Sequence, residues 1–282
     1  MSAFRPERLG WKPFLARAVV LLALAGGAGC AHLSEPAARS DALTQVSVID
    51  GLLVGEYSGA AACGELGRWG DFGLGTFEAL DGEMVMLEGV VYAVRGDGRV
   101  EAVRPEERTP FAAITFFDAD RTFPLELLDY PDVLDRLTQA LPSENHVHAI
   151  WIQGAFDRVK TRSVPRQSPP YPPLAKAVEG QAVFEFEKVE GDLIGFWIPP
   201  FGRGINATGW HFHFLSADRA GGGHVLEARL RKGVVRMDHI ADWNIRLSGA
   251  PAFLGADFTP DRSAELHRAE TDPWPAVPVE TK

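Results

Sequence analysis

Three histidines, at positions 211, 213 and 224, have the spacing of ligands to a single metal ion. His211 and His213 alternate with aromatic residues, and this period of two is typical of a β-strand, whose alternate side chains share one face. Residues 216–223 are rich in turn formers, and His224 opens a second apolar run, which is typical of the returning strand of a hairpin. We therefore expect the third imidazole to lie beside the first two.

Three neutral imidazoles on a rigid sheet, with a fourth coordination position open, are typical of a catalytic zinc site. Other divalent ions also accept imidazole ligands. The alternative is that the three histidines are unrelated and that one is an ordinary core residue. His146 and His148 show the same alternation, but no third ligand follows them at hairpin distance. We expect this second pair not to bind metal and His148 to be half-buried.

Most elements that must position these side chains are predicted to be strands. The predicted strands cover residues 44–50, 83–88, 89–95, 109–117, 146–152, 182–188, 193–198 and 234–239. Apolar residues at mixed spacings of three and four predict a helix over 125–141, and a short tail helix should follow Asp261. The proline-rich stretch 165–173 is the best candidate for a domain boundary.

Length and charge limit the class of protein. The chain has 282 residues, enough to bury a sizeable core, and its 46% hydrophobic and 23% charged content is ordinary for a globular protein. The formal net charge is −10. An acidic chain without a basic tract is a poor nucleic-acid binder.

The first 29 residues have the order of a secretory signal peptide. Four basic residues precede an apolar run over 18–25, and small residues follow up to Cys30. The run is too short for a comfortable membrane span. Cys30 after Ala28-Gly29 resembles a lipoprotein cleavage site, although Gly27 stands where a larger aliphatic residue is usual. We expect an exported protein, periplasmic or anchored by a lipid at Cys30, with a tether over 30–40. The only other cysteine is Cys63, so no disulfide is expected.

The segment 209–230, GWHFHFLSADRAGGGHVLEARL, resembles the metal-binding segment of bacterial α-acetolactate decarboxylases. The segments 44–59, 70–89, 109–117 and 157–174 resemble that family in the same order and spacing, so the resemblance covers roughly residues 41–270. It implies an α+β fold of two β-rich halves, with mixed or antiparallel sheets and few helices. With the proline-rich boundary, this gives an N-terminal β-sheet domain over 41–165 and a C-terminal metal-binding β domain with a tail helix over 166–282.

The resemblance also implies partners for the metal site. Arg162 matches the family's active-site arginine, Glu83 its active-site glutamate and Thr76 a pocket threonine. The family brings a glutamate from its C-terminal tail into the pocket, and Glu270 fits by its distance from the histidines, with Glu265 as the second choice. From the residues alone, each of these is equally well read as an ordinary surface or turn residue.

The implied activity is the decarboxylation of 2-acetolactate to acetoin and CO₂, with Zn²⁺ as the cofactor and a homodimer as the expected assembly. A metal held by the substrate's hydroxyl and carbonyl oxygens would stabilise the enediolate left by loss of CO₂. No lysine motif or diphosphate-binding signature indicates an organic cofactor.

Three alternatives to this activity remain open. One is a water-activating zinc enzyme resembling carbonic anhydrases, in which the third histidine lies much further along the chain. A second is a non-catalytic periplasmic metal-binding lipoprotein. The third is a cupin-like oxygenase, but residues 215–218 lack the glutamate that such a site needs.

Overall fold

The structure is a computed structural model that describes residues 41–271, with Thr271 described by its backbone alone. The predicted signal peptide, the tether and Cys30 lie outside the described residues. Within residues 41–271, no helix is long and apolar enough to cross a membrane.

A seven-stranded sheet is built mainly from the first half of the chain, in the order β14-β1-β8-β3-β4-β5-β6. Its strands are β1 (Ala42–Val46), β3 (Phe72–Thr76), β4 (Glu83–Leu87), β5 (Val90–Val94), β6 (Val100–Ala102), β8 (Ala112–Thr115) and β14 (Asp242–Arg246). The pairing of β1 with β14 is parallel and the others are antiparallel, so the sheet is mixed as predicted. A separate two-stranded ladder joins β2 (Ala61–Ala62) and β7 (Arg108–Thr109).

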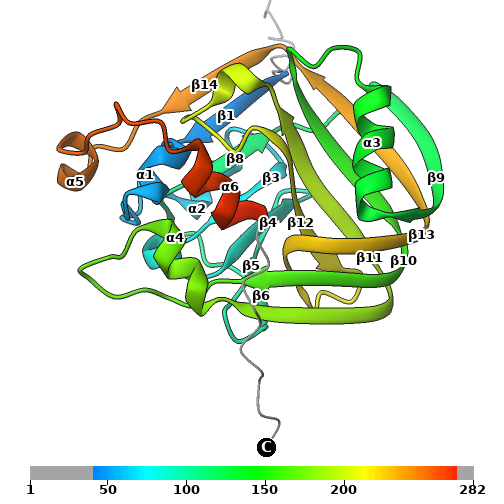
Figure 1. Cartoon of the computed structure of the whole chain (residues 1–282), viewed down its shortest axis with the longest axis horizontal. Coiled ribbons are helices and arrows are strands. Elements are labelled where there is room, and N and C mark those ends of the chain that lie inside the picture. Colours follow the sequence, from blue (N-terminus) through cyan, green and yellow to red (C-terminus); the bar gives the residue numbers. More distant parts are fainter. Residues whose placement is uncertain (1–40, 272–282) are drawn as a thin grey trace, which may run out of the picture. The chain divides into compact units, whose positions relative to one another are not determined.

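A second sheet has the order β10-β11-β12-β13-β9 and contains three long strands (Figure 1). Its strands are β9 (Arg121–Asp129), β10 (Val147–Ser163), β11 (Ala182–Ile198), β12 (Gly209–Ser216) and β13 (Gly222–Ile240). Strand β10 pairs with both β11 and β13, and β12 pairs with the same two strands. The four strands β10 to β13 therefore form a closed ring. Gly195 permits close packing beneath the metal hairpin, since a Cβ there would lie 2.2 Å from the His211 carbonyl oxygen.

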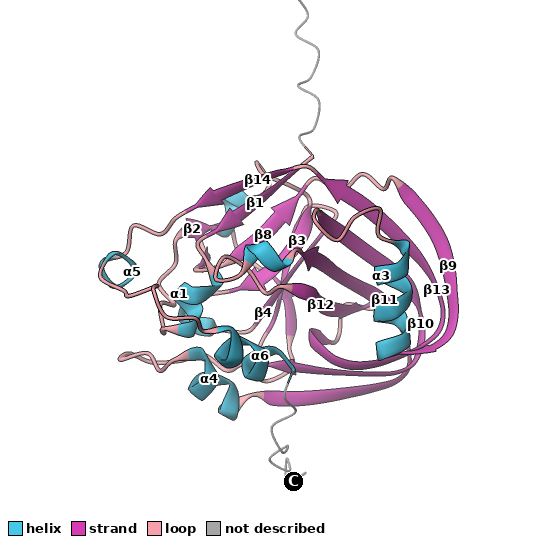
Figure 2. Cartoon of the chain, turned by 45° about the horizontal axis from the view of Figure 1, so that its top comes forward, coloured by secondary structure: helices cyan, strands magenta, loops and turns pink. Residues whose placement is uncertain are grey.

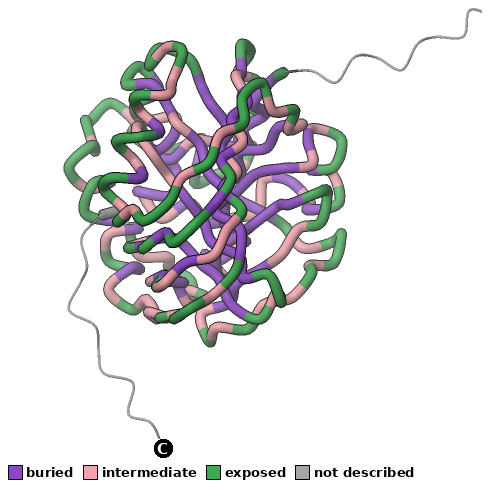
Figure 3. The backbone as a smooth tube through the Cα atoms, turned by 90° about the vertical axis from the view of Figure 1, so that its right-hand side faces the viewer, coloured by how far each residue is buried: buried purple, intermediate pink, exposed green. Residues whose placement is uncertain are grey.

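The main core lies between the two sheets. Alternate residues of both sheets, such as Leu74 and Val85 of the first and Ile194 and Phe196 of the second, form one buried apolar cluster. Figure 3 shows the buried segments running through the inside of the described chain, with exposed segments around them. His211 and His213 project from β12 toward this interior, which removes them from water.

The helices are α1 (Ile49–Leu53), α2 (Cys63–Leu66), α3 (Tyr130–Ala140), α4 (Leu174–Ala177), α5 (Pro251–Leu254) and α6 (Ser263–Thr271), with 3₁₀ turns η1 (Glu78–Leu80), η2 (Val178–Gly180) and η3 (Pro200–Gly202). Figure 2 shows α3 against the second sheet, and α1, α4 and α6 near one another on the other side of the picture. Helix α3 packs Val133 and Leu137 against the second sheet. Apolar residues of α1, α4 and α6 form a separate cluster that includes Leu52, Leu174 and Leu266.

Several sequence predictions differ from the observed elements. The strand predicted over 44–50 ends at Val46, and the strands predicted over 182–188 and 193–198 are one strand, β11. The helix predicted over 125–141 begins only at Tyr130, because residues 121–129 pair with β13 as strand β9. The predicted boundary near residue 165 does not divide the sheets. Strands β9 and β10, before it, belong to the second sheet, and β14, after it, belongs to the first. Long-range pairing thus joins the two predicted domains through their strands.

A buried carboxyl at one end of the second sheet predicts a pH-dependent stability. Asp238 on β13 is 2% exposed and lies near Asp41, Asp118 and Asp120. Burial, the largest cause, and the charges of these three residues together raise the pKa of Asp238 to about 7, against a hydrogen bond from the Asp118 N–H. The folded state therefore retains a proton that the unfolded chain loses near pH 4, so stability falls as pH rises from about 4 to 7.

We expect Asp238→Asn to remove this cost. The variant should gain about 2 kcal/mol of unfolding free energy over wild type at pH 8 and almost none at pH 4. Urea denaturation of both proteins at the two pH values measures this difference. Asp135→Asn, on the exposed side of α3, is the control and should show no such dependence on pH. An equal effect of Asp238→Asn at both pH values would exclude titration of this carboxyl as the cause.

Candidate active site

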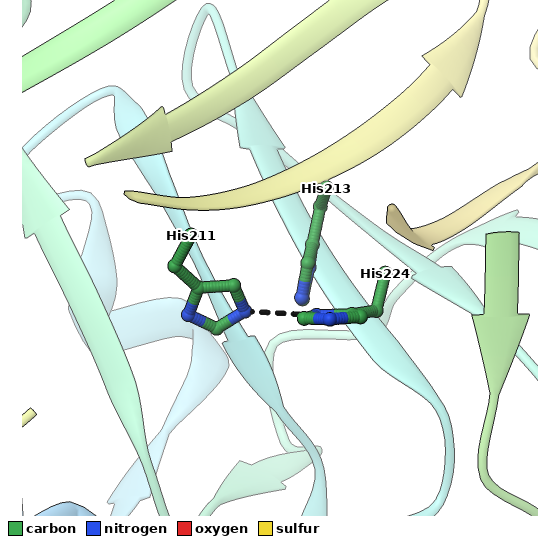
Figure 4. A group of neighbouring side chains, drawn as sticks. All are labelled: His211, His213 and His224. Atoms are coloured by element: carbon green, nitrogen blue, oxygen red, sulfur yellow. Dashed lines mark hydrogen bonds between the residues drawn. The ribbon is translucent and has the colours of Figure 1, made fainter. Parts of the chain in front are cut away.

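The three histidines converge at one point, as the hairpin pattern predicts (Figure 4). His211 and His213 are two residues apart on β12, and His224 on β13 stands opposite His213 in the strand register. One ligand nitrogen from each residue lies within 4.8 Å of the others. The His211 Nε2 and His224 Nδ1 atoms are 3.0 Å apart. Three strand positions thus bring three imidazoles to a single point between the sheets.

His213 and His224 are buried, the His211 side chain is 10% exposed, and all three histidines are uncharged at neutral pH. Burial lowers the pKa values of His211 and His213 to about 3, and it lowers that of His224 well below its usual value. The His213 Nδ1–H donates to the Met84 carbonyl oxygen at 2.7 Å, which leaves Nε2 with its lone pair free. That Nε2 is buried without a hydrogen-bond partner among the described residues. Neutral, oriented imidazoles with an unpartnered nitrogen fit a metal ion.

Arg162 reaches the site from β10. It stands opposite His224 in the register between β10 and β13, and its side chain is 5% exposed. Its Nη1 donates to Gln181 Oε1 at 3.1 Å, and its Nε is buried without a partner within the described chain. A cation held in this way is available to an anionic ligand. Ser163, the next residue, ties β10 to the first sheet through a 2.7 Å hydrogen bond to the Val94 carbonyl oxygen.

Glu83 reaches the site from the other sheet. It begins β4, and its Oε2 lies 3.6 Å from His213 Nε2. Burial raises the pKa of Glu83 to about 7, although the charge of Arg162 opposes this. A carboxyl with a pKa near neutrality is suited to take up or release a proton.

The turn before Glu83 holds that carboxyl in place. Ala79, Leu80 and Gly82 all have positive φ angles, of 64°, 55° and 96°. Thr76 Oγ1 donates to the Gly82 carbonyl oxygen at 2.7 Å, so this predicted pocket residue also closes the turn that leads into Glu83. Such backbone strain persists only where surrounding contacts determine it.

The tail helix brings Glu270, and not Glu265, to the histidines. The Glu270 Oε2 lies 3.5 Å from His224 Nε2 and 3.6 Å from His211 Nε2. Burial raises the pKa of Glu270, against the charge of Arg162. The Glu265 Oε2 instead lies 3.4 Å from Nη1 of Arg262, the residue that precedes the helix. Helix α6 is held by Leu266 and Ala269, which pack against α1 and α4.

The predicted second histidine pair does not form a comparable group. His148 is fully buried and not half-buried as predicted, and its Nε2 bonds the Ser143 carbonyl oxygen at 2.8 Å. His146 is exposed, and its ring meets that of His239 edge-on, with the ring centroids 4.5 Å apart. The only group of metal-ligating type within residues 41–271 is His211, His213 and His224.

Two features of the site have no signal in the sequence. Gln181 contacts Arg162, and the Met84 carbonyl oxygen orients His213; neither belongs to a motif. The site encloses a cavity of about 40 Å³. Its apolar lining comes from Ile49, Leu52, Leu80, Phe111, Val164, Leu174 and Val178.

Comparisons with known proteins agree with this geometry. The family model for alpha-acetolactate decarboxylase matches residues 43–260. The alpha-acetolactate decarboxylase of Methanosarcina mazei is 43% identical over 232 residues, covering 82% of this chain and 81% of the relative. That of Klebsiella aerogenes is 42% identical over 220 residues, covering 77% and 84%.

A solved structure agrees in fold as well. The crystal structure of alpha-acetolactate decarboxylase from Bacillus subtilis superposes with a TM-score of 0.80 at 36% identity, and the match covers 82% of this chain and all of that one. Sequence and structure therefore lead to one conclusion: the chain belongs to the alpha-acetolactate decarboxylase family.

Proposed function

We propose that the chain is a metal-dependent carboxy-lyase that converts 2-acetolactate to acetoin and CO₂, with zinc as its metal. The observation that supports this most is the meeting of three neutral histidines with a buried arginine and two glutamates. His211, His224, the arginine and both glutamates line one small cavity, and His213 stands beside them. Zinc is the first choice because three imidazoles with an open fourth position suit its tetrahedral coordination.

The substrate explains why these groups are needed together. 2-Acetolactate carries a carboxylate and a hydroxyl on one carbon, next to a ketone. When the bond to the carboxylate breaks, CO₂ leaves and the electron pair passes to the ketone oxygen, forming an enediolate. A bound metal supplies Lewis acidity for the negative charge on the substrate oxygens.

The chain's own residues would then bind the substrate and move a proton. Arg162 is placed to bind the carboxylate, because its guanidinium is buried and an anion would satisfy its free N–H. Glu83, with a pKa near 7, can deliver the proton that converts the enediolate carbon to acetoin. Glu270, from helix α6, can orient the substrate hydroxyl. The apolar lining of the cavity excludes water from the reacting carbon.

Removing the metal is expected to abolish this activity. The purified chain, treated with a chelator and dialysed, should release acetoin from racemic 2-acetolactate no faster than the spontaneous reaction. Added zinc should restore the rate, because the orphaned His213 Nε2 is already oriented. Circular dichroism before and after chelation checks that the fold is kept. No acetoin above the spontaneous rate from a folded, zinc-loaded chain would contradict the proposal, and hydration of CO₂ would be measured next.

Export, lipidation and dimerisation extend this proposal. Residues 1–29 have the order of a secretory signal, and Cys30 stands where a lipidated cysteine would follow cleavage. We therefore propose that the enzyme acts outside the cytoplasm, periplasmic or anchored to a membrane by lipid. A homodimer also stays a prediction from the resemblance.

A further inference from the structure

The Arg162 guanidinium hydrogen-bonds a neutral amide and lies beyond hydrogen-bond distance of the Glu270 carboxylate. Its Nη1 donates to Gln181 Oε1 at 3.1 Å, whereas its Nη2 stays 3.9 Å from Glu270 Oε2. Charge-assisted hydrogen bonds between guanidinium and carboxylate are usually near 2.8 Å. Both the Arg162 Nε and the Glu270 Oε2 are buried without a hydrogen-bond partner in the described part of the chain. The Arg162 guanidinium and the Glu270 carboxylate therefore form a loose ion pair without a hydrogen bond between them.

Gln181 is the polar side chain that accepts a hydrogen bond from the guanidinium. It follows the 3₁₀ turn η2, and its N–H donates to the Val178 carbonyl oxygen at 3.0 Å, which fixes its backbone. Its side chain is half-buried and lines a larger cavity of about 640 Å³ beside the site. Lys176, Arg262 and Arg268 line the same cavity. Gln181 therefore lies between this cavity and Arg162.

The amide of Gln181 matters because it carries no charge. A glutamine oxygen accepts a hydrogen bond from arginine without cancelling the positive charge, whereas a glutamate would form an ion pair and neutralise it. In a buried site of low effective dielectric, the uncancelled charge is a strong attraction for an anion. A single hydrogen bond thus both orients the guanidinium and keeps its charge for a ligand.

We propose that Gln181 is a positioning residue that orients the Arg162 guanidinium without compensating its positive charge, and so makes the site selective for a carboxylate over a neutral analogue. This inference rests on the proposed function in one respect, namely that Arg162 meets the substrate carboxylate. Gln181 itself does not contact the reacting atoms.

Two substitutions separate the two roles of Gln181. Gln181→Glu keeps the hydrogen bond and adds a negative charge, while Gln181→Met keeps the length of the side chain and removes the bond. Glu179→Gln is the matched control, because Glu179 lines the same larger cavity but pairs with Lys176. Thermal melting of all three zinc-loaded chains shows whether each one folds.

Binding of an unreactive ligand pair gives a readout that a structural role would not move. 2-Hydroxy-2-methylbutanoate lacks the ketone and cannot decarboxylate, and its amide differs from it in charge. By calorimetry, Gln181→Glu should lose about tenfold in affinity for the acid and keep its affinity for the amide, as expected when one charge contact is cancelled.

The kinetic constants should follow the same division. We expect Gln181→Glu to raise KM for 2-acetolactate about tenfold with a smaller change in kcat, because ground-state attraction is lost. In Gln181→Met, Arg162 is free to close on Glu270, so kcat should also fall, by about tenfold. The control should match wild type in both constants.

The proposal is overturned if a folded Gln181→Glu chain binds the acid as tightly as wild type, or if it loses the acid and the amide equally. A wild-type chain that binds the acid but releases no acetoin would instead overturn the proposed function, and the comparison of the two ligands would still decide the role of Gln181.

Discussion

Replacing His213 with alanine is expected to remove both the bound metal and the activity. The rate of acetoin release should fall on the order of a thousandfold or more, toward the spontaneous rate. Without the metal, no Lewis acid would stabilise the negative charge that develops on the substrate oxygens. His213 is the most constrained of the three histidines. It is 1% exposed, and its Nδ1–H is already committed to the Met84 carbonyl oxygen. Within residues 41–271, no other residue of ligand type belongs to the group of His211, His213 and His224, so the nitrogen that is lost is not replaced.

The matched control for this substitution is His146→Ala. His146 begins the other His-x-His pair in the chain, but it is exposed and belongs to no metal-ligating group. We expect this variant to keep wild-type zinc content and activity. Metal content by elemental analysis and acetoin release are measured on the same samples. Retention of one zinc ion per chain and of activity in His213→Ala would show that the metal is held elsewhere.

The metal hairpin could be predicted because its signals are local. Alternation places His211 and His213 on one face of a strand, and the turn formers that follow reverse the chain within a few residues. The returning strand then brings His224 opposite His213. Period and turn chemistry are sufficient for such a short-range arrangement.

The partners of the metal site depend on long-range pairing, which no local pattern encodes. Arg162 meets His224 only because β10 pairs with β13, and Glu83 meets His213 only because two sheets pack face to face. The resemblance to a family identified both residues. It reached Glu270 only as one of two choices, and this position lies beyond the matched residues 43–260. Gln181, which follows the proline-rich connection, carried no signal of any kind.

The prediction of a helix over 125–141 failed for a related reason. Leu125 and Leu128 fit a helical pattern, but they also fit the edge strand that pairs with β13. The helix begins at Tyr130 with Pro131 in its first turn, where a missing N–H is harmless. Only the tertiary pairing chooses between the two readings, so the boundary of this element could not be placed from the sequence.

Replacing Glu83 with glutamine is expected to slow the reaction while leaving the metal in place. An amide fills the same volume but cannot release a proton, so kcat should fall by about a hundredfold or more, the range that a general acid contributes. KM should change much less, since Glu83 faces His213 from β4 whereas Arg162 is placed for the carboxylate. The turn that positions residue 83 is closed by Thr76, which the substitution leaves intact.

Glu88→Gln is the control that isolates this chemistry. Glu88 follows directly on the last residue of the same strand but is exposed, so losing its charge should affect neither rate nor metal content. Steady-state kinetics and zinc analysis of both variants distinguish proton transfer from metal binding. If Glu83→Gln lost zinc together with activity, Glu83 would act by supporting His213 and not by moving a proton. If it kept full kcat, the proton that completes acetoin would have to come from another group, such as Glu270, whose Oε2 lies 3.5 Å from His224 Nε2 and 3.6 Å from His211 Nε2.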